Sequence, residues 1–376
     1  MTRTLEVAIA AGGTAGHINP AIALAEELRS RGHHVTFYGQ TAKLEGTLVP
    51  QAGFELVPIV VTGFDRSRPW TLVSALVRER SATSQILARF RESGVPDVAI
   101  GFGAYVELPL ISACHAEGVP VVLHEQNSVP GLANKTSAKR AARVCVSLPQ
   151  AIPAFSDRVS DPGAIVVTGN PVRQSVVTAD HAAGRAAFGI PEDATMLLVF
   201  GGSLGAMHLN RGVCGLKDEL LGREGLWIVH STGKDDYDAV VSSLALSGDE
   251  KARWQVMPYI SNMGEALAAA DLVVSRAGAS SIAEIAALAV PSLLVPYPFA
   301  TADHQTTNAH YLVDAGAAVL VADADIDAPV FSEQLLSLVD DPQRRATMRA
   351  AARGLGQDRA ASALADQVES AAATRE

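Results

Sequence analysis

VAIAAGGTAGHINP, residues 7–20, joins a short apolar run directly to a cluster of glycines, a lone histidine and a proline. The run Val7–Ala11 is typical of a buried strand, and the apolar spacing that follows predicts a helix over Pro20–Arg31, ended by Gly32. Glycines remove side chains where the backbone turns sharply, and free N–H groups at a helix start can hold an anion. His17 can exchange a proton near neutral pH. Two interpretations stand: a phosphate-binding loop with a base beside it, or a tight turn with an incidental histidine.

A second stretch, LLVFGGSLGAMHLN at residues 197–210, repeats the order of apolar run, GGxxG and helix-type sequence. Neither loop has the GxGxxG spacing of a dinucleotide-binding fingerprint, and the P-loop sequence does not occur, which argues against an NAD enzyme and a P-loop NTPase. Each loop alone fits a packing turn as well as an anion site, but two at equivalent strand ends favour anion binding. The repeat predicts two similar nucleotide-binding halves, joined through Asp161–Pro171.

Short β-branched runs alternate with alanine-rich helical stretches along the chain. Such alternation predicts an α/β fold of doubly wound parallel sheets, which bind ligands at the carboxyl ends of their strands. From residue 342 onward the sequence predicts one or two closing helices. The predicted strands are Val7–Ala11, His33–Tyr38, Val98–Gly101, Val119–His124, Val144–Leu148, Ile165–Thr168, Met196–Phe200, Leu226–His230, Gln255–Met257, Leu272–Ser275 and Ser292–Val295.

The composition is that of a well-buried globular protein. The chain has 376 residues, 48% hydrophobic and 19% charged, and this length exceeds what one core usually holds. We expect no signal peptide, because Val7–Ala11 is too short for an h-region and glycines follow at once. We expect a soluble protein, because the longest apolar candidate, Ile285–Val295, is broken by Pro291. The three cysteines lack the spacing of a zinc site or a disulfide framework and fit a reducing compartment. The formal net charge of -10 argues against general nucleic-acid binding.

SRAGASSIAE, residues 275–284, follows another predicted strand. Ser280 and Ser281 open a predicted helix whose N–H groups and dipole suit a phosphate, and Glu284 can accept hydrogen bonds from a ribose diol. The alternative is a capping box between Ser281 and Glu284, which needs no ligand.

Three further segments carry polar groups at predicted strand ends. DHQTTNA, residues 303–309, offers neutral donors and acceptors for sugar hydroxyls, or is a helix start capped by Asp303. HEQN, residues 124–127, leaves an apolar strand where an α/β site should lie, or is a satisfied turn. GNPVR, residues 169–173, ends in an arginine that can hold a pyrophosphate bidentately or form a surface ion pair.

Taken in order and spacing, these segments resemble the MurG family of bacterial glycosyltransferases nearly end to end. That family adds N-acetylglucosamine from UDP-GlcNAc to a lipid-linked muramyl-pentapeptide in peptidoglycan synthesis. The resemblance implies the GT-B architecture of two Rossmann-like domains that face each other across a cleft. It implies an acceptor and membrane-side domain over residues 1–165, a UDP-GlcNAc-binding domain over 166–345, and a C-terminal helix over 346–376 that packs back on the first domain.

The resemblance also implies donor contacts. Ala279 and Ser281 would present N–H groups to the sugar and diphosphate, and Glu284 would bind the ribose. Ile260 would read uracil through its backbone. Gln305 would bind GlcNAc hydroxyls, beside a histidine where the family has a second amide. The full implied donor set is Thr14, Gly16, Asn127, Arg173, Ser203, Ile260, Ala279, Ser280, Ser281, Glu284, His304 and Gln305.

The acceptor side is implied to involve three loops of the first half. In GFGAYVELP, residues 101–109, Ala104 and Glu107 replace small residues of the commoner family pattern. Some family members carry an acidic residue, discussed as a base, where this chain has Ala42, which favours His17 as the base here. The implied acceptor loops contain Gly12, Gly13, Gly103 and Tyr105, and the implied catalytic residues are His17, His124 and Glu125.

The expected chemistry is an inverting displacement in which the muramyl 4-hydroxyl attacks the anomeric carbon opposite UDP. We expect no obligatory metal and no other cofactor, because no DxD-like acidic pair stands at a predicted strand end. Phe64–Arg80 combines aliphatic residues and a tryptophan with arginines, which suits an anionic bilayer surface or, alternatively, an amphipathic core-facing helix.

The expected partners follow from the resemblance. They are UDP-GlcNAc, lipid I (undecaprenyl-pyrophosphoryl-MurNAc-pentapeptide), an anionic membrane surface and other cell-wall synthesis proteins, with no nucleic acid. The expected location is peripheral, on the cytoplasmic face of the cell membrane. Two other functions fit the donor motifs: a UDP-GlcNAc 2-epimerase on the same fold, and a catalytically silent nucleotide-sugar-binding partner of a membrane enzyme.

Overall fold

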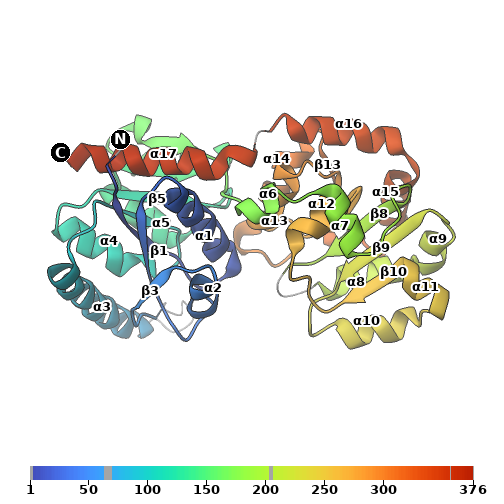
Figure 1. Cartoon of the computed structure of the whole chain (residues 1–376), viewed down its shortest axis with the longest axis horizontal. Helices are drawn as coiled ribbons and strands as arrows, with labels where there is room; N and C mark the ends of the chain where they lie inside the picture. The colour runs from blue at the N-terminus through green and yellow to red at the C-terminus, as the bar shows by residue number, and fades with distance from the viewer. Residues whose placement is uncertain (1–2, 63–69, 203–205, 356, 376) are drawn as a thin grey trace. The chain divides into compact units, whose positions relative to one another are not determined.

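The computed structural model describes residues 3–62, 70–202, 206–355 and 357–375. The chain divides into two compact units. Figure 1 shows the chain coloured from blue at the N-terminus to red at the C-terminus. Unit 1 comprises Met1–Arg173 with Arg359–Glu376, and unit 2 comprises Gln174–Asp358.

Both unit boundaries lie later in the chain than residues 165 and 345, where we expected them. The segment after residue 165 stays with unit 1 because the carbonyl oxygen of Gly169 is 3.0 Å from Nε2 of the buried His124. Helix α16 (Pro342–Arg353) stays with unit 2, since it packs on α13 and α15 there and Arg349 donates to the carbonyl of Ala270. Of the closing helices, α17 (Ala360–Ala372) is the one that returns to unit 1.

Unit 1 is built on a seven-stranded sheet in the order β3-β2-β1-β4-β5-β6-β7, and every pairing in it is parallel. The strands are β1 (Glu6–Ala10), β2 (His34–Gly39), β3 (Glu55–Pro58), β4 (Val98–Gly101), β5 (Val121–Glu125), β6 (Arg143–Val146) and β7 (Ile165–Val167). The connecting helices are α1 (Ala15–Ser30), α2 (Glu45–Gln51), α3 (Thr71–Ser93), α4 (Glu107–Ala116) and α5 (Leu132–Ser137), with 3-10 turns at Ala138–Arg140, Pro149–Ala154, Pro162–Ala164 and Ala373–Arg375.

Helix α1 starts earlier than the sequence pattern predicts. Thr14 has extended backbone (φ -137°, ψ 157°) and precedes a helix that begins at Ala15, so His17 lies in the first turn. Proline is favoured in the first helical turn, which is why Pro20 suggested the start, but here it lies inside the helix. The earlier start places the histidine on the helix rather than in the loop.

Helix α17 is held against α1 by apolar packing and by charge. Its residues Leu364, Ala365 and Val368 share one buried cluster with the apolar face of α1. Arg31, at the end of α1, pairs with Asp366 and Glu369 of α17 at 2.6 and 3.1 Å. The C-terminal helix, red in Figure 1, is therefore an integral part of unit 1.

Unit 2 has a six-stranded sheet in the order β10-β9-β8-β11-β12-β13, again with every pairing parallel. The strands are β8 (Thr195–Phe200), β9 (Leu226–Ser231), β10 (Trp254–Met257), β11 (Leu272–Ser275), β12 (Ser292–Leu294) and β13 (Ala318–Leu320). The α-helices other than α16 are α6 (Gln174–Val177), α7 (His181–Ala187), α8 (Met207–Cys214), α9 (Lys217–Leu221), α10 (Tyr237–Leu244), α11 (Gly248–Arg253), α12 (Met263–Ala269), α13 (Ala279–Ala287), α14 (His304–Val313) and α15 (Pro329–Asp340), and 3-10 turns lie at Thr301–Asp303, Asp323–Asp325 and Gln357–Arg359.

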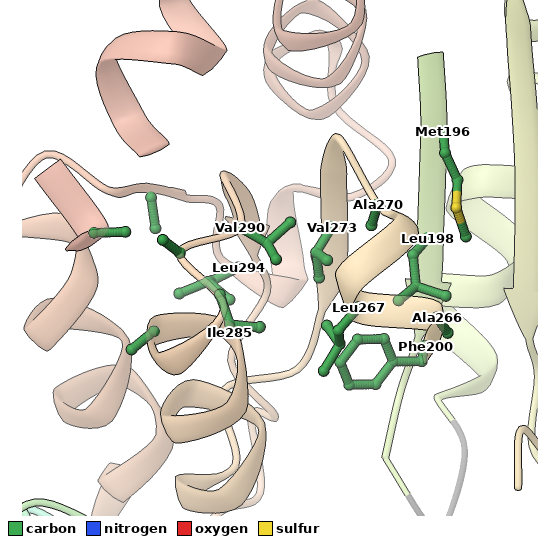
Figure 2. Close-up of a cluster of buried hydrophobic side chains, with 14 of the residues drawn as sticks. Met196, Leu198, Phe200, Ala266, Leu267, Ala270, Val273, Ile285, Val290 and Leu294 are labelled. Atoms are coloured by element: carbon green, nitrogen blue, oxygen red, sulfur yellow. The ribbon is translucent and has the colours of Figure 1, made fainter. Parts of the chain in front are cut away.

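Strand β8 shows how this sheet is covered on both faces. Met196, Leu198 and Phe200 belong to one buried cluster, together with Leu267 of α12, as Figure 2 shows. Leu197, between them in sequence, belongs to a second buried cluster with residues of α8 and α15. Alternate side chains of a strand point to opposite faces, so this strand is apolar on both sides. The predicted doubly wound α/β fold is confirmed in both units.

Candidate functional site

The carboxyl ends of the parallel strands gather the predicted site residues at one edge of each sheet. At this edge of the unit 1 sheet, the loop after β1 contains the predicted glycines. Glu45 lies fully buried behind them. Its carboxylate accepts hydrogen bonds from the backbone N–H of Gly13 at 3.3 Å and of Gln40 at 3.2 Å. A Cβ atom on Gly12 would lie 2.6 Å from Glu45 Oε1, so a side chain at this position would have to displace the buried carboxylate. Sequence reasoning missed Glu45, because the glycine loop that it contacts lies 32 residues earlier in the chain.

His17 borders the loops after both β1 and β4. Its Nδ1 atom is 3.0 Å from the hydroxyl of Thr14, which orients the ring. Burial lowers the pKa of His17 to about 4, so the imidazole is neutral at pH 7 and retains a lone pair for a proton. A Cβ on Gly103 would lie 3.5 Å from His17 Cδ2. The structure therefore brings His17, Thr14 and Gly103 together.

The loop after β4 contains two residues with left-handed backbone. Gly103 has φ +81° and Ala104 has φ 62°, a conformation that strains an alanine but not a glycine. Tyr105 accepts a hydrogen bond from the Gln40 amide at 3.2 Å, which links this loop to the end of β2. The predicted acceptor loops thus form one connected surface of unit 1.

The side chains of His124 and Glu125 in the HEQN segment are buried and hydrogen-bonded within unit 1, although the sequence predicted catalytic roles for both. His124 is fully buried, with its Nε2 3.0 Å from the Gly169 carbonyl and its Nδ1 3.0 Å from the Gln126 amide, and burial lowers its pKa to about 4. Glu125 accepts from the backbone N–H of Asn127 and Gly131, each at 3.0 Å. Burial raises the pKa of Glu125, although these hydrogen bonds oppose the shift. Both side chains hold the loop that presents Asn127.

In unit 2 the start of helix α13 has the geometry of an anion site. The helix begins at Ala279 after Gly278, and no side chain caps it, so the capping box between Ser281 and Glu284 is not formed at this N-terminus. The first three N–H groups, from Ala279 to Ser281, therefore have no partner within the helix. Glu284 lies half-buried one turn further along. The uncapped helix start and Glu284 therefore lie one helical turn apart on α13.

Gln305 joins two neighbouring strand ends. Its Oε1 accepts from the backbone N–H of Ala277 at 3.1 Å and of Tyr297 at 3.0 Å, so the loops after β11 and β12 are tied together. Its Nε2 donates no hydrogen bond within the described ranges and is available to a ligand. The Nδ1 atom of the neighbouring His304 is 2.9 Å from the carbonyl oxygen of Thr301. Asp303 precedes α14 without capping its backbone, contrary to the alternative interpretation of this segment.

Arg173, the last residue of unit 1, is half-buried and its Nε atom has no hydrogen-bond partner. No ion pair ties it to any described residue, so the surface ion pair considered from sequence is not formed there. Ile260 is buried after β10, next to the exposed Tyr259. The predicted diphosphate contact Ser203 lies outside the described residues.

Sequence reasoning missed a charged cluster at the same edge of unit 2. Arg276 is buried and pairs with Asp323 at 2.5 Å, and its Nη1 donates to the carbonyl oxygens of Val295 and Pro296. His208 of α8 contacts the same carboxylate at 2.8 Å, and this contact raises the pKa of the histidine. The cluster fixes the ends of β11 and β12 and the start of α8. Its one sequence signal was the arginine inside SRAGASSIAE.

Within the described ranges no three His, Cys, Asp or Glu side chains gather as a metal site. Over the same ranges no helix has the length and apolar character to cross a bilayer.

Both units of the chain match known glycosyltransferase domains. Residues 7–146 match the glycosyltransferase family 28 N-terminal domain, and residues 196–368 match the glycosyltransferase family 28 C-terminal domain. A Salinibacter ruber protein named UDP-N-acetylglucosamine–N-acetylmuramyl-(pentapeptide) pyrophosphoryl-undecaprenol N-acetylglucosamine transferase is 40% identical over 371 residues, 98% of this chain and 97% of the relative. A Moorella thermoacetica protein of the same name is 37% identical over 368 residues, 96% of this chain and 97% of the relative.

A solved structure agrees with these sequence relatives. The crystal structure of Acinetobacter baumannii MurG matches with a TM-score of 0.74 at 30% identity, and the match covers 97% of this chain and 99% of that chain. The two Rossmann-like units confirm the predicted GT-B fold class. Since this identity extends over nearly the whole of both chains, the protein belongs to the MurG family of glycosyltransferases.

Proposed function

We propose that this enzyme transfers N-acetylglucosamine from UDP-GlcNAc to the 4-hydroxyl of undecaprenyl-pyrophosphoryl-MurNAc-pentapeptide, with inversion at the anomeric carbon. The observation that carries the proposal is the near-full-length likeness to proteins named for this transfer. The uncapped start of α13 and Arg173, whose Nε atom has no hydrogen-bond partner, support it, because they offer positive charge to a departing diphosphate.

Unit 2 is proposed to bind the donor. The N–H groups of Ala279 to Ser281 bind the diphosphate, Glu284 accepts from the ribose hydroxyls, and the backbone of Ile260 contacts uracil. Arg173, the last residue of unit 1, is proposed as a further ligand of the diphosphate. Gln305 donates through Nε2 to a sugar hydroxyl, since its Oε1 is already used by two backbone N–H groups. As the bond from the anomeric carbon to the diphosphate oxygen breaks, the electron pair leaves with UDP, and these donors hold the charge that develops.

Unit 1 is proposed to bind the acceptor. His17 takes the proton of the 4-hydroxyl as its oxygen bonds to the anomeric carbon, and Thr14 orients the ring. His124 and Glu125 are proposed as positioning residues rather than catalytic ones, because both are buried and hydrogen-bonded within their own unit. They fix the loop that presents Asn127.

We further propose that helix α3 docks on an anionic membrane, which puts the enzyme at the cytoplasmic face of the cell membrane beside other cell-wall synthesis proteins. Trp70 just before the helix and Val73 and Val77 on it are 71%, 68% and 62% exposed, so these residues do not face the core. Arg78 and Arg80 are exposed on the same helix and can attract anionic lipid. Arg66 and Arg68 of the predicted membrane stretch lie outside the described residues.

Replacing Trp70 by glutamate is expected to weaken binding to anionic liposomes by about tenfold or more, because an aromatic anchor is exchanged for a charge that the surface repels. Co-sedimentation with vesicles containing phosphatidylglycerol measures it. Phe299→Glu is the matched control, since Phe299 is 82% exposed but belongs to unit 2. Equal binding of Trp70→Glu and the control would refute docking through α3.

The proposed transfer is tested by incubating the enzyme with UDP-GlcNAc and lipid I and analysing both products. UDP release together with a lipid-linked disaccharide supports it. Formation of UDP-ManNAc would indicate an epimerase, and donor binding without turnover would indicate a silent partner.

A further inference from the structure

Glu107 is a buried carboxyl group that the proposed mechanism does not use. It is the first residue of α4, and its side chain is fully buried beneath the turn after β4. Its Oε2 accepts the backbone N–H of Gly103 at 2.6 Å, and a Cβ on Gly101 would lie 2.5 Å from the same oxygen. The turn and the carboxyl group therefore pack directly against each other.

The turn that Glu107 holds is the one that borders the proposed base. A side chain at Gly103 would meet His17 Cδ2 at 3.5 Å and Asn134 Nδ2 at 3.3 Å. A shift of this turn by a few tenths of an ångström therefore alters the space beside the imidazole. The connection from Glu107 to His17 passes through a single glycine.

The surroundings of Glu107 favour its neutral form. Within the described residues no lysine, arginine or histidine forms an ion pair with it. Burial raises the pKa of Glu107 from 4.5 to about 8; the Gly103 N–H opposes this shift, the nearby carboxylate of Glu125 on β5 adds to it, and the Ser137 hydroxyl on α5 opposes it. At pH 7 the group is a carboxylic acid that still accepts a hydrogen bond through Oε2.

We propose that Glu107 is a positioning residue that holds Gly103, and through it the ring of His17, in the arrangement that receives the acceptor. The proposal rests on the proposed function in assigning the acceptor to unit 1. Ionisation near pH 8 leaves a negative charge without a paired cation in the interior, and relief of that charge is expected to move the turn. The KM for the acceptor then rises while the KM for UDP-GlcNAc is unchanged.

The test compares wild type, Glu107→Gln and Glu107→Ala between pH 6 and 9, with Glu117→Gln as a control on an exposed glutamate just after the same helix. Glu107→Gln keeps a neutral acceptor, so its kinetics match wild type at pH 7 and lack the alkaline rise in acceptor KM. Glu107→Ala leaves the Gly103 N–H unpaired and lowers kcat/KM for the acceptor by about tenfold. An unchanged acceptor KM in Glu107→Ala, or the same alkaline rise in Glu107→Gln, overturns the proposal.

A second measurement needs no turnover and keeps the result separate from the proposed function. The ring signals of His17 in a histidine-labelled protein are expected to shift in Glu107→Ala and to stay in place in Glu107→Gln. Absence of lipid I turnover by wild type would defeat the proposed function alone. His17 signals that do not move in Glu107→Ala would contradict the positioning role alone. If that variant does not fold, the wild-type signals are followed between pH 7 and 9 instead. Signals that do not move over this range would contradict the positioning role in the same way.

Stability reports the protonation of Glu107 independently. Because its pKa is raised on folding, the folded state binds more protons than the unfolded state between pH 4.5 and about 8, and stability falls as the pH rises through this window. Glu107→Gln has no proton to lose at this position, so it removes the fall in stability with pH. Its free energy of unfolding should exceed that of wild type increasingly up to pH 8, and a constant difference would contradict a neutral Glu107.

Discussion

His17→Ala is expected to lower kcat for transfer to lipid I by about 10²–10⁴-fold, the usual contribution of a positioned general base. The KM for UDP-GlcNAc should stay unchanged, because the proposal assigns His17 to the acceptor and not to the donor. The ring is oriented by Thr14 and lies against Gly103, so its loss removes both the proton acceptor and its placement. Steady-state kinetics with varied donor and acceptor measure the effect.

The pH dependence gives this prediction a second readout. With a pKa of about 4, His17 is in its base form throughout the neutral range, so the wild-type rate should show no histidine inflection near pH 6.5 and should fall only as the pH approaches 4. His115→Ala, on an exposed histidine of α4, serves as the control. If His17→Ala retained the wild-type rate across neutral pH, another group would have to be the base.

Arg173→Ala is expected to lower kcat by about 10²–10³-fold, the cost of removing one oriented donor from a developing negative charge. The argument is that Arg173 is half-buried with an unpartnered Nε, so its guanidinium is not committed to a carboxylate of the described structure. Arg173→Lys should recover part of the rate, since lysine keeps the charge and loses the bidentate geometry. Quenched-flow measurement of UDP formation isolates this step.

The matched control for Arg173 is Arg353→Ala, which removes an exposed arginine at the end of α16. It should leave turnover within about twofold of wild type, as is usual for surface substitutions. Turnover of Arg173→Ala equal to that of the control would remove Arg173 from the donor site.

The fold was predictable where strands are buried on both faces. Strands such as β1 and β8 are continuous apolar runs followed by glycines, and this signal is local. The strands missed, β3 and β13, are short and lie at sheet edges; no residue of β3 is buried and only the first residue of β13 is. With so few buried apolar side chains neither segment forms the continuous apolar run that marks a central strand, although the edge strands β7 and β10 were recognised.

The site was predictable to the level of loops, less so to the level of contacts. Gly12 could be chosen as a close-approach glycine, but the atom that approaches it belongs to Glu45, more than thirty residues away in the chain. Arg276 and Asp323 meet in the same nonlocal way. His124 and Glu125 were correctly located at the end of β5, yet only the structure gives their hydrogen bonds, and these assign the side chains to the loop.

The central claim is a single displacement in which the acceptor hydroxyl attacks opposite UDP while His17 takes its proton. The most direct test is the anomeric configuration of the lipid-linked disaccharide, read from the coupling of its anomeric proton by NMR. UDP-GlcNAc carries an α-linked sugar, so the account predicts a β-glycosidic bond to the 4-oxygen of the muramyl residue. An α-linked product would mean retention and would contradict it.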